Sequence, residues 1–175
     1  MQSIYKKIII IGHTGQLGSA VFDRLKNSYN VLVPKDRNCF CLPTADILIN
    51  CAGKVIFGSV LNLSEEDVED MLDANIKLAW RASKQFIVNG GKHIINIGST
   101  RSFSTAPFKS IYSATKHAIK ALTESIPIDH PTVKSSLICP GNFTNNPLLL
   151  NTVVDAVEFA IEHPETKEII CGGQI

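Results

Sequence analysis

Tyr112 and Lys116 are the residues of this chain whose types and spacing most directly suggest chemistry. They stand four residues apart in Ile111–Ser125, whose apolar periodicity predicts a helix, so the phenol and the ammonium can point into one pocket. A nearby cation favours tyrosinate, and we expect it to lower a tyrosine pKa that is ordinarily about 10. Such a tyrosine can act as an acid–base group, typically worth ~10²–10⁴ in rate. An ordinary pair on a surface helix has the same spacing.

A second candidate site is a glycine-rich turn near the start of the chain. It follows the predicted strand Lys7–Ile11 and precedes the predicted helix Leu17–Leu25. Glycines at this spacing permit a tight turn and close approach of the backbone to a pyrophosphate, and the helix N-terminus offers free N–H groups. The turn therefore predicts a dinucleotide site with the contacts Gly12, Thr14, Gly15, Gln16, Leu17 and Gly18. The alternative is an ordinary strand-to-helix turn that binds no ligand.

The preference between NAD and NADP is weakly encoded after the second predicted strand. An acid there favours NAD by bonding the ribose hydroxyls, whereas basic groups favour the 2′-phosphate of NADP. The stretch contains Lys35, Asp36 and Arg37, so both chemistries are present. We expect NADP slightly over NAD, and solvated loop charges are the alternative for each residue.

Short apolar runs alternate with longer amphipathic ones, which is typical of βαβ units. The predicted strands are Lys7–Ile11, Asn30–Val33, Asp46–Asn50, His93–Ile97, Val133–Ile138 and Glu168–Cys171. The predicted helices are Leu17–Leu25, Glu65–Val88 with a break, Ile111–Ser125 and Val153–Glu162. Ser64 and Asp67 indicate a capping box, and Pro127 is expected to end the third helix. We predict one α/β domain over residues 1–175, a three-layer Rossmann-like, doubly wound parallel sheet of six to seven strands.

Composition excludes several classes of protein. Lys plus Arg number 17 against 16 acids, which gives no global charge for binding nucleic acid or a lipid surface. No apolar run reaches the roughly 20 residues that cross a bilayer, so we expect a cytoplasmic protein. The five cysteines lack zinc-ligand spacing, and we expect no metal site and mostly reduced, structural thiols, with a redox switch as the alternative.

Further motifs occur in a fixed order and make the chain resemble the short-chain dehydrogenase/reductase family. The glycine turn is followed by Asn50-Cys51-Ala52-Gly53 after the third predicted strand and by Asn75 in the long helix. Ser99 ends the next strand, thirteen residues before Tyr112, and Pro140-Gly141 and Gly172-Gly173 follow later strands. The resemblance covers nearly the whole chain.

The resemblance implies an oxidoreductase that transfers hydride between NAD(P) and a small carbonyl or alcohol. Tyr112 would exchange the proton of the substrate oxygen, and Ser99 would hydrogen-bond that oxygen. Lys116 would bind the nicotinamide ribose and lower the pKa of Tyr112, while Asn75 would hold a water. Residues implied to lie at the cofactor also include Asn50, Cys51, Ala52, Gly53, Pro140, Gly141 and Thr144.

The chain also departs from the family pattern in two places. Only eleven residues separate Val33 from Ala45, where the family usually has a helix and a strand beside the adenine. The segment between Gly141 and Asn151 is too short for the family's substrate-covering loop, so the pocket should be open or closed by another subunit. These losses keep open an NAD(P)-binding sensor or scaffold with little catalysis, and the first glycine turn resembles that of sugar-nucleotide reductases.

A stripe of small residues on one predicted helix suggests that the chain forms an oligomer. Ala114, Ala118, Ala121 and Ser125 form a stripe of small residues on the Tyr112 helix. We expect a homodimer, or a tetramer of dimers, through the Glu65–Val88 and Ile111–Ser125 helices, with Trp80 at the contact. Packing of the stripe against the sheet is the alternative.

Overall fold

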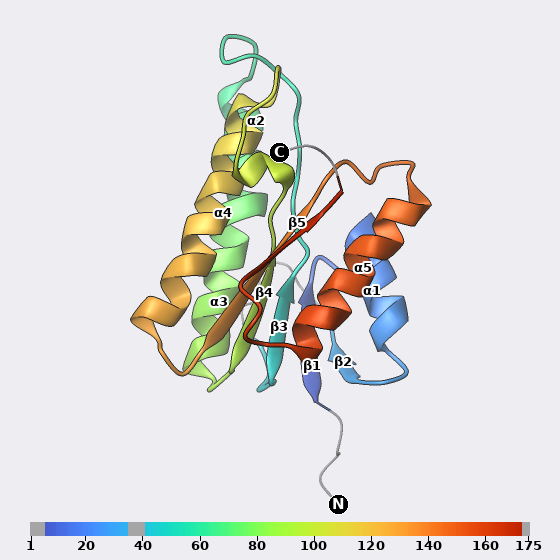
Figure 1. The fold of residues 1–175 in the computed structure, drawn as a ribbon. Helices are drawn as coiled ribbons and strands as arrows, with labels where there is room; N and C mark the ends of the chain where they lie inside the picture. The colour runs from blue at the N-terminus through green and yellow to red at the C-terminus, as the bar shows by residue number, and fades with distance from the viewer. Residues whose placement is uncertain (1–5, 35–40, 173–175) are drawn as a thin grey trace, which may run out of the picture.

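The computed structural model describes residues 6–34 and 41–172, in which six strands form a single parallel sheet (Figure 1). The strand order is β2-β1-β3-β4-β5-β6, and every pairing is parallel. The strands are β1 (Lys7–Ile11), β2 (Asn30–Leu32), β3 (Ile47–Asn50), β4 (His93–Ile97), β5 (Lys134–Pro140) and β6 (Glu168–Cys171). This order confirms the predicted doubly wound parallel sheet, because the chain moves from β1 to one edge and then returns to build the other side.

Helices cover both faces of the sheet. They are α1 (Gln16–Leu25), α2 (Glu65–Leu72), α3 (Leu78–Val88), α4 (Ser110–Asp129) and α5 (Pro147–Glu162). Helices α1 and α5 lie side by side on one face, and α2, α3 and α4 lie on the other (Figure 1). The chain thus has the three layers expected from its sequence.

The isoleucines of β1 show why this strand is apolar throughout. Ile8 and Ile10 pack in the core under α1 and α5, whereas Ile9 and Ile11 pack in the core under α3 and α4. Successive strand residues point to opposite faces, so a strand covered on both sides needs apolar residues at every position.

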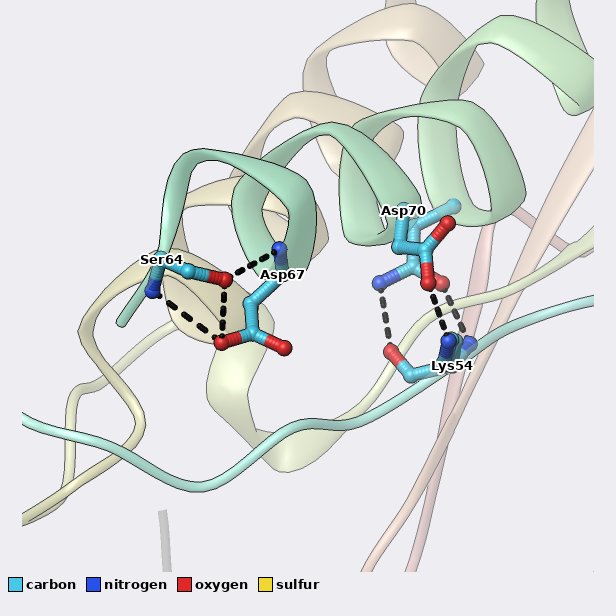
Figure 2. Close-up of polar contacts among 5 residues, drawn as sticks. Lys54, Ser64, Asp67 and Asp70 are labelled. Carbon is cyan, nitrogen blue, oxygen red and sulfur yellow. Dashed lines mark hydrogen bonds and ion pairs between the residues drawn. The ribbon is translucent and has the colours of Figure 1, made fainter. Parts of the chain in front are cut away.

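The predicted helix Glu65–Val88 is interrupted, as expected. A π-helical turn, η1 (Asp73–Lys77), joins α2 to α3. The start of α2 has the predicted capping box: the Ser64 hydroxyl accepts from the Asp67 N–H at 3.1 Å, and the Asp67 carboxylate accepts from the Ser64 N–H at 3.0 Å (Figure 2). Two backbone N–H groups at the start of the helix are thereby satisfied.

Helix α4 does not end at Pro127, so that prediction is wrong. The helix continues to Asp129 with Pro127 inside it. Proline lacks the N–H that would bond the carbonyl four residues earlier, which belongs to Thr123. The Ser135 hydroxyl donates to this carbonyl at 2.6 Å instead, and a tertiary hydrogen bond therefore replaces the helical one.

Helix α5 also begins earlier than the predicted Val153. It starts at Pro147, and the Asn146 side chain accepts from the Leu149 N–H at 3.1 Å. Proline suits the first helical position because no partner for its missing N–H is needed there. The short segment after Gly141 thus enters a helix almost directly.

Candidate active site

A cavity of about 250 Å³ lies at the carboxyl ends of the central strands. The N-terminus of α1, the segments that follow β3, β4 and β5, and one face of α4 contribute its walls. Its lining residues are Gly15, Gln16, Leu17, Gly18, Cys51, Gly53, Lys54, Val55, Ile97, Gly98, Ser99, Tyr112, Lys116, Pro140, Gly141 and Phe143. Sheets of this class bind ligands at this edge, where the strand order reverses.

The turn between β1 and α1 is packed so closely that Gly12 and Gly18 leave no space for a side chain. Gly12 has φ +82°, and its carbonyl accepts from the Gly15 N–H at 3.1 Å. A Cβ on Gly18 would lie 2.1 Å from the Gly12 oxygen, whereas a Cβ on Gly15 would lie 3.5 Å from it. Gly15 is the N-cap of α1 and supplies no side-chain cap, which leaves the first N–H groups of the helix to face the cavity. This cradle fits a dinucleotide pyrophosphate.

Lys116 is almost completely buried at the floor of the cavity. Its Nζ donates to the Ile97 carbonyl at 3.0 Å and lies 5.8 Å from the centre of the Tyr112 ring. Burial lowers the pKa of Lys116 to about 8, because a charged ammonium is poorly solvated there. A Cβ on Gly53 would lie 3.5 Å from this Nζ, so the glycine keeps the backbone close to the ammonium.

Tyr112 meets Ser99 at the same cavity. Burial raises the pKa of Tyr112 above its ordinary value, while its hydrogen bond with Ser99 and the positive charge of Arg101 act in the opposite direction. The expectation that Lys116 lowers the pKa of Tyr112 is therefore wrong, because the net shift of this pKa is upward. Loss of water around the phenolate costs more than the nearby charges return.

Asn75 lies in the π-helical turn and is buried. Its Oδ1 accepts from the Lys54 N–H at 2.6 Å, and its Nδ2 donates to the Lys54 carbonyl at 2.9 Å and to Thr115 Oγ1 at 2.9 Å. The amide therefore fixes the backbone just after Gly53 to helix α4. This positioning by direct contact was not anticipated, although π-turns often occur at functional sites.

The structure brings most, but not all, of the predicted residues to the cavity. Eleven of the lining residues were predicted; the unpredicted ones are Lys54, Val55, Ile97, Gly98 and Phe143. Predicted residues that do not line the cavity include Gly12, Thr14, Asn50, Ala52 and Asn75. Asn50 is buried and donates to Asn96 Oδ1 at 2.7 Å. Lys54 directly follows the predicted Gly53, and that adjacency was the available signal for it.

The remaining predicted cofactor contacts are not among the described residues that line the cavity. Thr144 does not line the cavity; Phe143 does, and the Thr144 N–H is bonded to Asn142 Oδ1 at 3.2 Å. The residues Lys35, Asp36 and Arg37 lie outside the described residues. Within the two described ranges, no cluster of three His, Cys, Asp or Glu side chains could hold a metal, and no helix has the length and hydropathy to span a membrane.

Solved structures with the same fold are numerous. The crystal structure of serine dehydrogenase from Escherichia coli superposes with a TM-score of 0.81 at 22% identity, covering 94% of this chain and 96% of that one. A 4-hydroxyisoleucine dehydrogenase complexed with NADH and succinate matches with a TM-score of 0.80 at 23% identity, covering 94% and 98%. At these identities the likeness concerns the fold.

Curated relatives match over part of their length. An uncharacterized oxidoreductase of Thermotoga maritima is 32% identical over 110 residues, covering 59% of this chain and 44% of the relative. Oxidoreductase UcpA of Escherichia coli K12 is 33% identical over 103 residues, covering 55% and 39%. The aligned part thus spans less than half of either relative.

The model of the family described as short chain dehydrogenase matches residues 41–149. This range is more than half of the chain, and it contains Gly53, Asn75, Ser99, Tyr112 and Lys116. The resemblance stated from the motifs is therefore confirmed: the chain belongs to the short-chain dehydrogenase family.

Proposed function

We propose that this protein is an NAD(P)-dependent oxidoreductase acting on a small carbonyl or alcohol. The observation that carries the proposal is the cavity, in which Ser99, Tyr112 and Lys116 share one lining with the glycine turn. A phenol, a hydroxyl and an ammonium beside a pyrophosphate cradle are the groups that hydride transfer to a carbonyl requires of a protein.

The proposed roles follow from position and charge. A nicotinamide cofactor supplies or accepts the hydride. Tyr112 donates its phenolic proton to the carbonyl oxygen during reduction and takes it back during oxidation. Ser99 donates a hydrogen bond to the same oxygen, and Lys116 binds the cofactor ribose and stabilises the tyrosinate that proton donation creates. Asn75 holds the backbone at Lys54 so that Gly53 stays beside Lys116.

Cofactor preference is proposed as NADP over NAD. Among proteins of this fold, one structure contains NADH, and an alcohol dehydrogenase from Thermococcus sibiricus is complexed with 5-hydroxy-NADP. Both nucleotides are thus compatible with the architecture. Titration with NADPH and NADH, followed by nicotinamide fluorescence, decides between them; tighter binding of NADH would reverse the proposed order.

The substitution Tyr112→Phe tests the proposed mechanism. It removes the hydroxyl and keeps the ring, so turnover of ketones and alcohols should fall by at least ~10²-fold while cofactor binding remains. Lys84→Gln, which removes a charge beside Trp80 on α3, is the matched control and should retain activity. Turnover that survives Tyr112→Phe would refute the role of Tyr112. Cofactor binding without turnover by the wild type across the panel would favour a binding module.

A further inference from the structure

The lining of the candidate site contains positively charged side chains but no carboxylate. No Asp or Glu occurs between residues 74 and 123, a stretch that contains Ser99, Tyr112 and the loop between them. The cavity lining contains two lysines and no carboxylate. A cation of this region that has no carboxylate partner within the described residues is therefore a candidate to bind an anionic group of a substrate.

Three of the cations at or near the cavity already have partners. Lys54 forms an ion pair with Asp70 (Figure 2). Lys116 is buried and bonded to the Ile97 carbonyl, and it faces the proposed cofactor ribose. Lys109 lies over the Phe57 ring, 5.2 Å from its centre. These three side chains are occupied by acid, carbonyl and aromatic partners respectively.

Arg101 differs from them. It lies in η2 (Thr100–Ser102), and its backbone N–H donates to the Ser99 hydroxyl at 3.1 Å. Its guanidinium donates from one nitrogen to Ser104 Oγ at 3.0 Å and to the Thr105 carbonyl at 2.7 Å. Both acceptors are neutral, and across residues 6–34 and 41–172 no carboxylate pairs with Arg101, whereas Arg24 pairs with Asp155 and Glu158.

The guanidinium is held in place and lies within electrostatic reach of the reacting phenol. The side chain is half-buried, and its charge acts on Tyr112 to lower the pKa of the hydroxyl. An arginine fixed by one nitrogen keeps the rest of its planar fork for a second ligand, and this fork matches the two oxygens of a carboxylate. Arg101 does not itself line the cavity, but its backbone N–H binds the hydroxyl of Ser99, which does.

We propose that Arg101 anchors a carboxylate of the substrate, so that the reaction interconverts an oxo acid and a hydroxy acid. This inference rests on the proposed function and names its substrate class. The carboxylate lies against the Arg101 guanidinium, which orients the carbonyl oxygen toward Ser99 and Tyr112. The carbonyl gains a hydride from the cofactor and a proton from Tyr112; the carboxylate and the guanidinium remain unchanged.

The test compares short oxo acids with their methyl esters, which differ only in charge at the anchoring group. Acetoacetate and levulinate, each with its methyl ester, are assayed with NADPH and NADH as probes. The wild type should prefer the acids. Arg101→Gln should reduce kcat/KM for the acids by about tenfold or more, mainly through KM, and leave the esters nearly unchanged. Arg101→Lys should recover part of the loss, and Lys84→Gln is the control.

A second readout separates anchoring from a purely electrostatic effect on Tyr112. If Arg101 acts only through the pKa of the phenol, Arg101→Gln will shift the pH–rate profile and lower kcat equally for acids and esters, which would overturn the proposal. Malonate, which cannot be reduced, should compete with the oxo acids and lose at least tenfold in affinity in Arg101→Gln. Equal turnover of acids and esters by the wild type would overturn the carboxylate anchor and leave the oxidoreductase standing.

Discussion

At the scale of single residues, the two glycines at the start of α1 differ in the space that they leave for a Cβ. Gly15 and Gly18 both line the cavity, but a Cβ on Gly18 would collide with the Gly12 oxygen, whereas a Cβ on Gly15 would lie at an ordinary contact distance from it. Both glycines belong to the same turn, but their local packing differs. One permits the backbone to pack, and the other leaves room for a ligand.

A pair of substitutions tests this division. Gly18→Ala would place a Cβ 2.1 Å from the Gly12 oxygen and should lower the free energy of unfolding by about 1–3 kcal/mol through overpacking. Gly15→Ala meets its nearest atom at 3.5 Å, so it should fold with near wild-type stability but bind the cofactor more weakly. Urea denaturation and cofactor titration of both variants check this. Equal stability of the two variants would contradict the assignment.

At the scale of elements, hydrogen bonds between distant segments determine where a helix ends. Burial of a histidine in a strand makes the stability of the protein depend on pH. Helix α4 passes through Pro127 because Ser135 supplies the missing donor. The start of β4 buries His93, whose Nε2 lies 3.0 Å from Ser136 Oγ. Since that hydroxyl donates to the Thr166 carbonyl, His93 must donate through Nε2. Its buried Nδ1 has no hydrogen-bond partner among the described residues.

The substitution Ser135→Ala measures the bond that replaces the helical one. It leaves the Thr123 carbonyl unsatisfied and should cost about 1–2 kcal/mol of unfolding free energy. In a Pro127→Ala background the cost should shrink, because the N–H of residue 127 can then donate to that carbonyl. A double-mutant cycle by denaturant unfolding measures the coupling, and additive effects would show that the two groups do not substitute for each other.

His93 makes stability depend on pH. Burial lowers its pKa to about 4 in the folded protein, compared with about 6.5 when unfolded. As the pH falls below 6.5, the unfolded chain takes up the proton first, so the unfolding free energy should drop by about 2 kcal/mol between pH 7 and pH 5. Urea midpoints at both values check this. His93→Gln removes the titrating group and should flatten the dependence; an unchanged slope would exclude His93 as its source.

At the scale of the whole molecule, the outer face of α4 carries the stripe of small residues defined above. Ala114, Ala121 and Ser125 are exposed, whereas Ile119 and Ile126 face inward, so the stripe does not pack against the sheet. Trp80, on α3 in the same layer of helices, is 49% exposed. We propose that this face forms the homodimer contact, since small residues allow close approach of two helices.

A bulky charge on this face tests the assembly. Ala121→Arg should shift the protein to the monomer in sedimentation equilibrium, because the side chain would lie between the two copies of α4. Asn151→Arg, on the exposed side of α5, adds the same charge to the opposite face and should leave the assembly unchanged. A wild type that sediments as a monomer would exclude the dimer itself.

Much of this architecture could be predicted from the chain alone. Periodicity located all six strands and their helices, because burial on both faces of a parallel sheet requires apolar residues at every strand position. The glycine turn and the Tyr112–Lys116 pair were predicted from the spacing of their residues. Gly53 and Ser99 were predicted through the resemblance to the family, and both line the cavity. These motifs depend on residues close together in the chain, so their spacing can be recognised in the sequence.

Other properties were decided only in the tertiary structure. The fate of Pro127 depended on Ser135, the role of Asn75 on the backbone at Lys54, and the pKa of Tyr112 on burial that outweighs its neighbouring charges. Arg101 became a candidate anchor only in the structure, where it adjoins Ser99 and pairs with no carboxylate of the described residues. Desolvation and charge act through space between residues far apart in the chain, so no local pattern of residues encodes them.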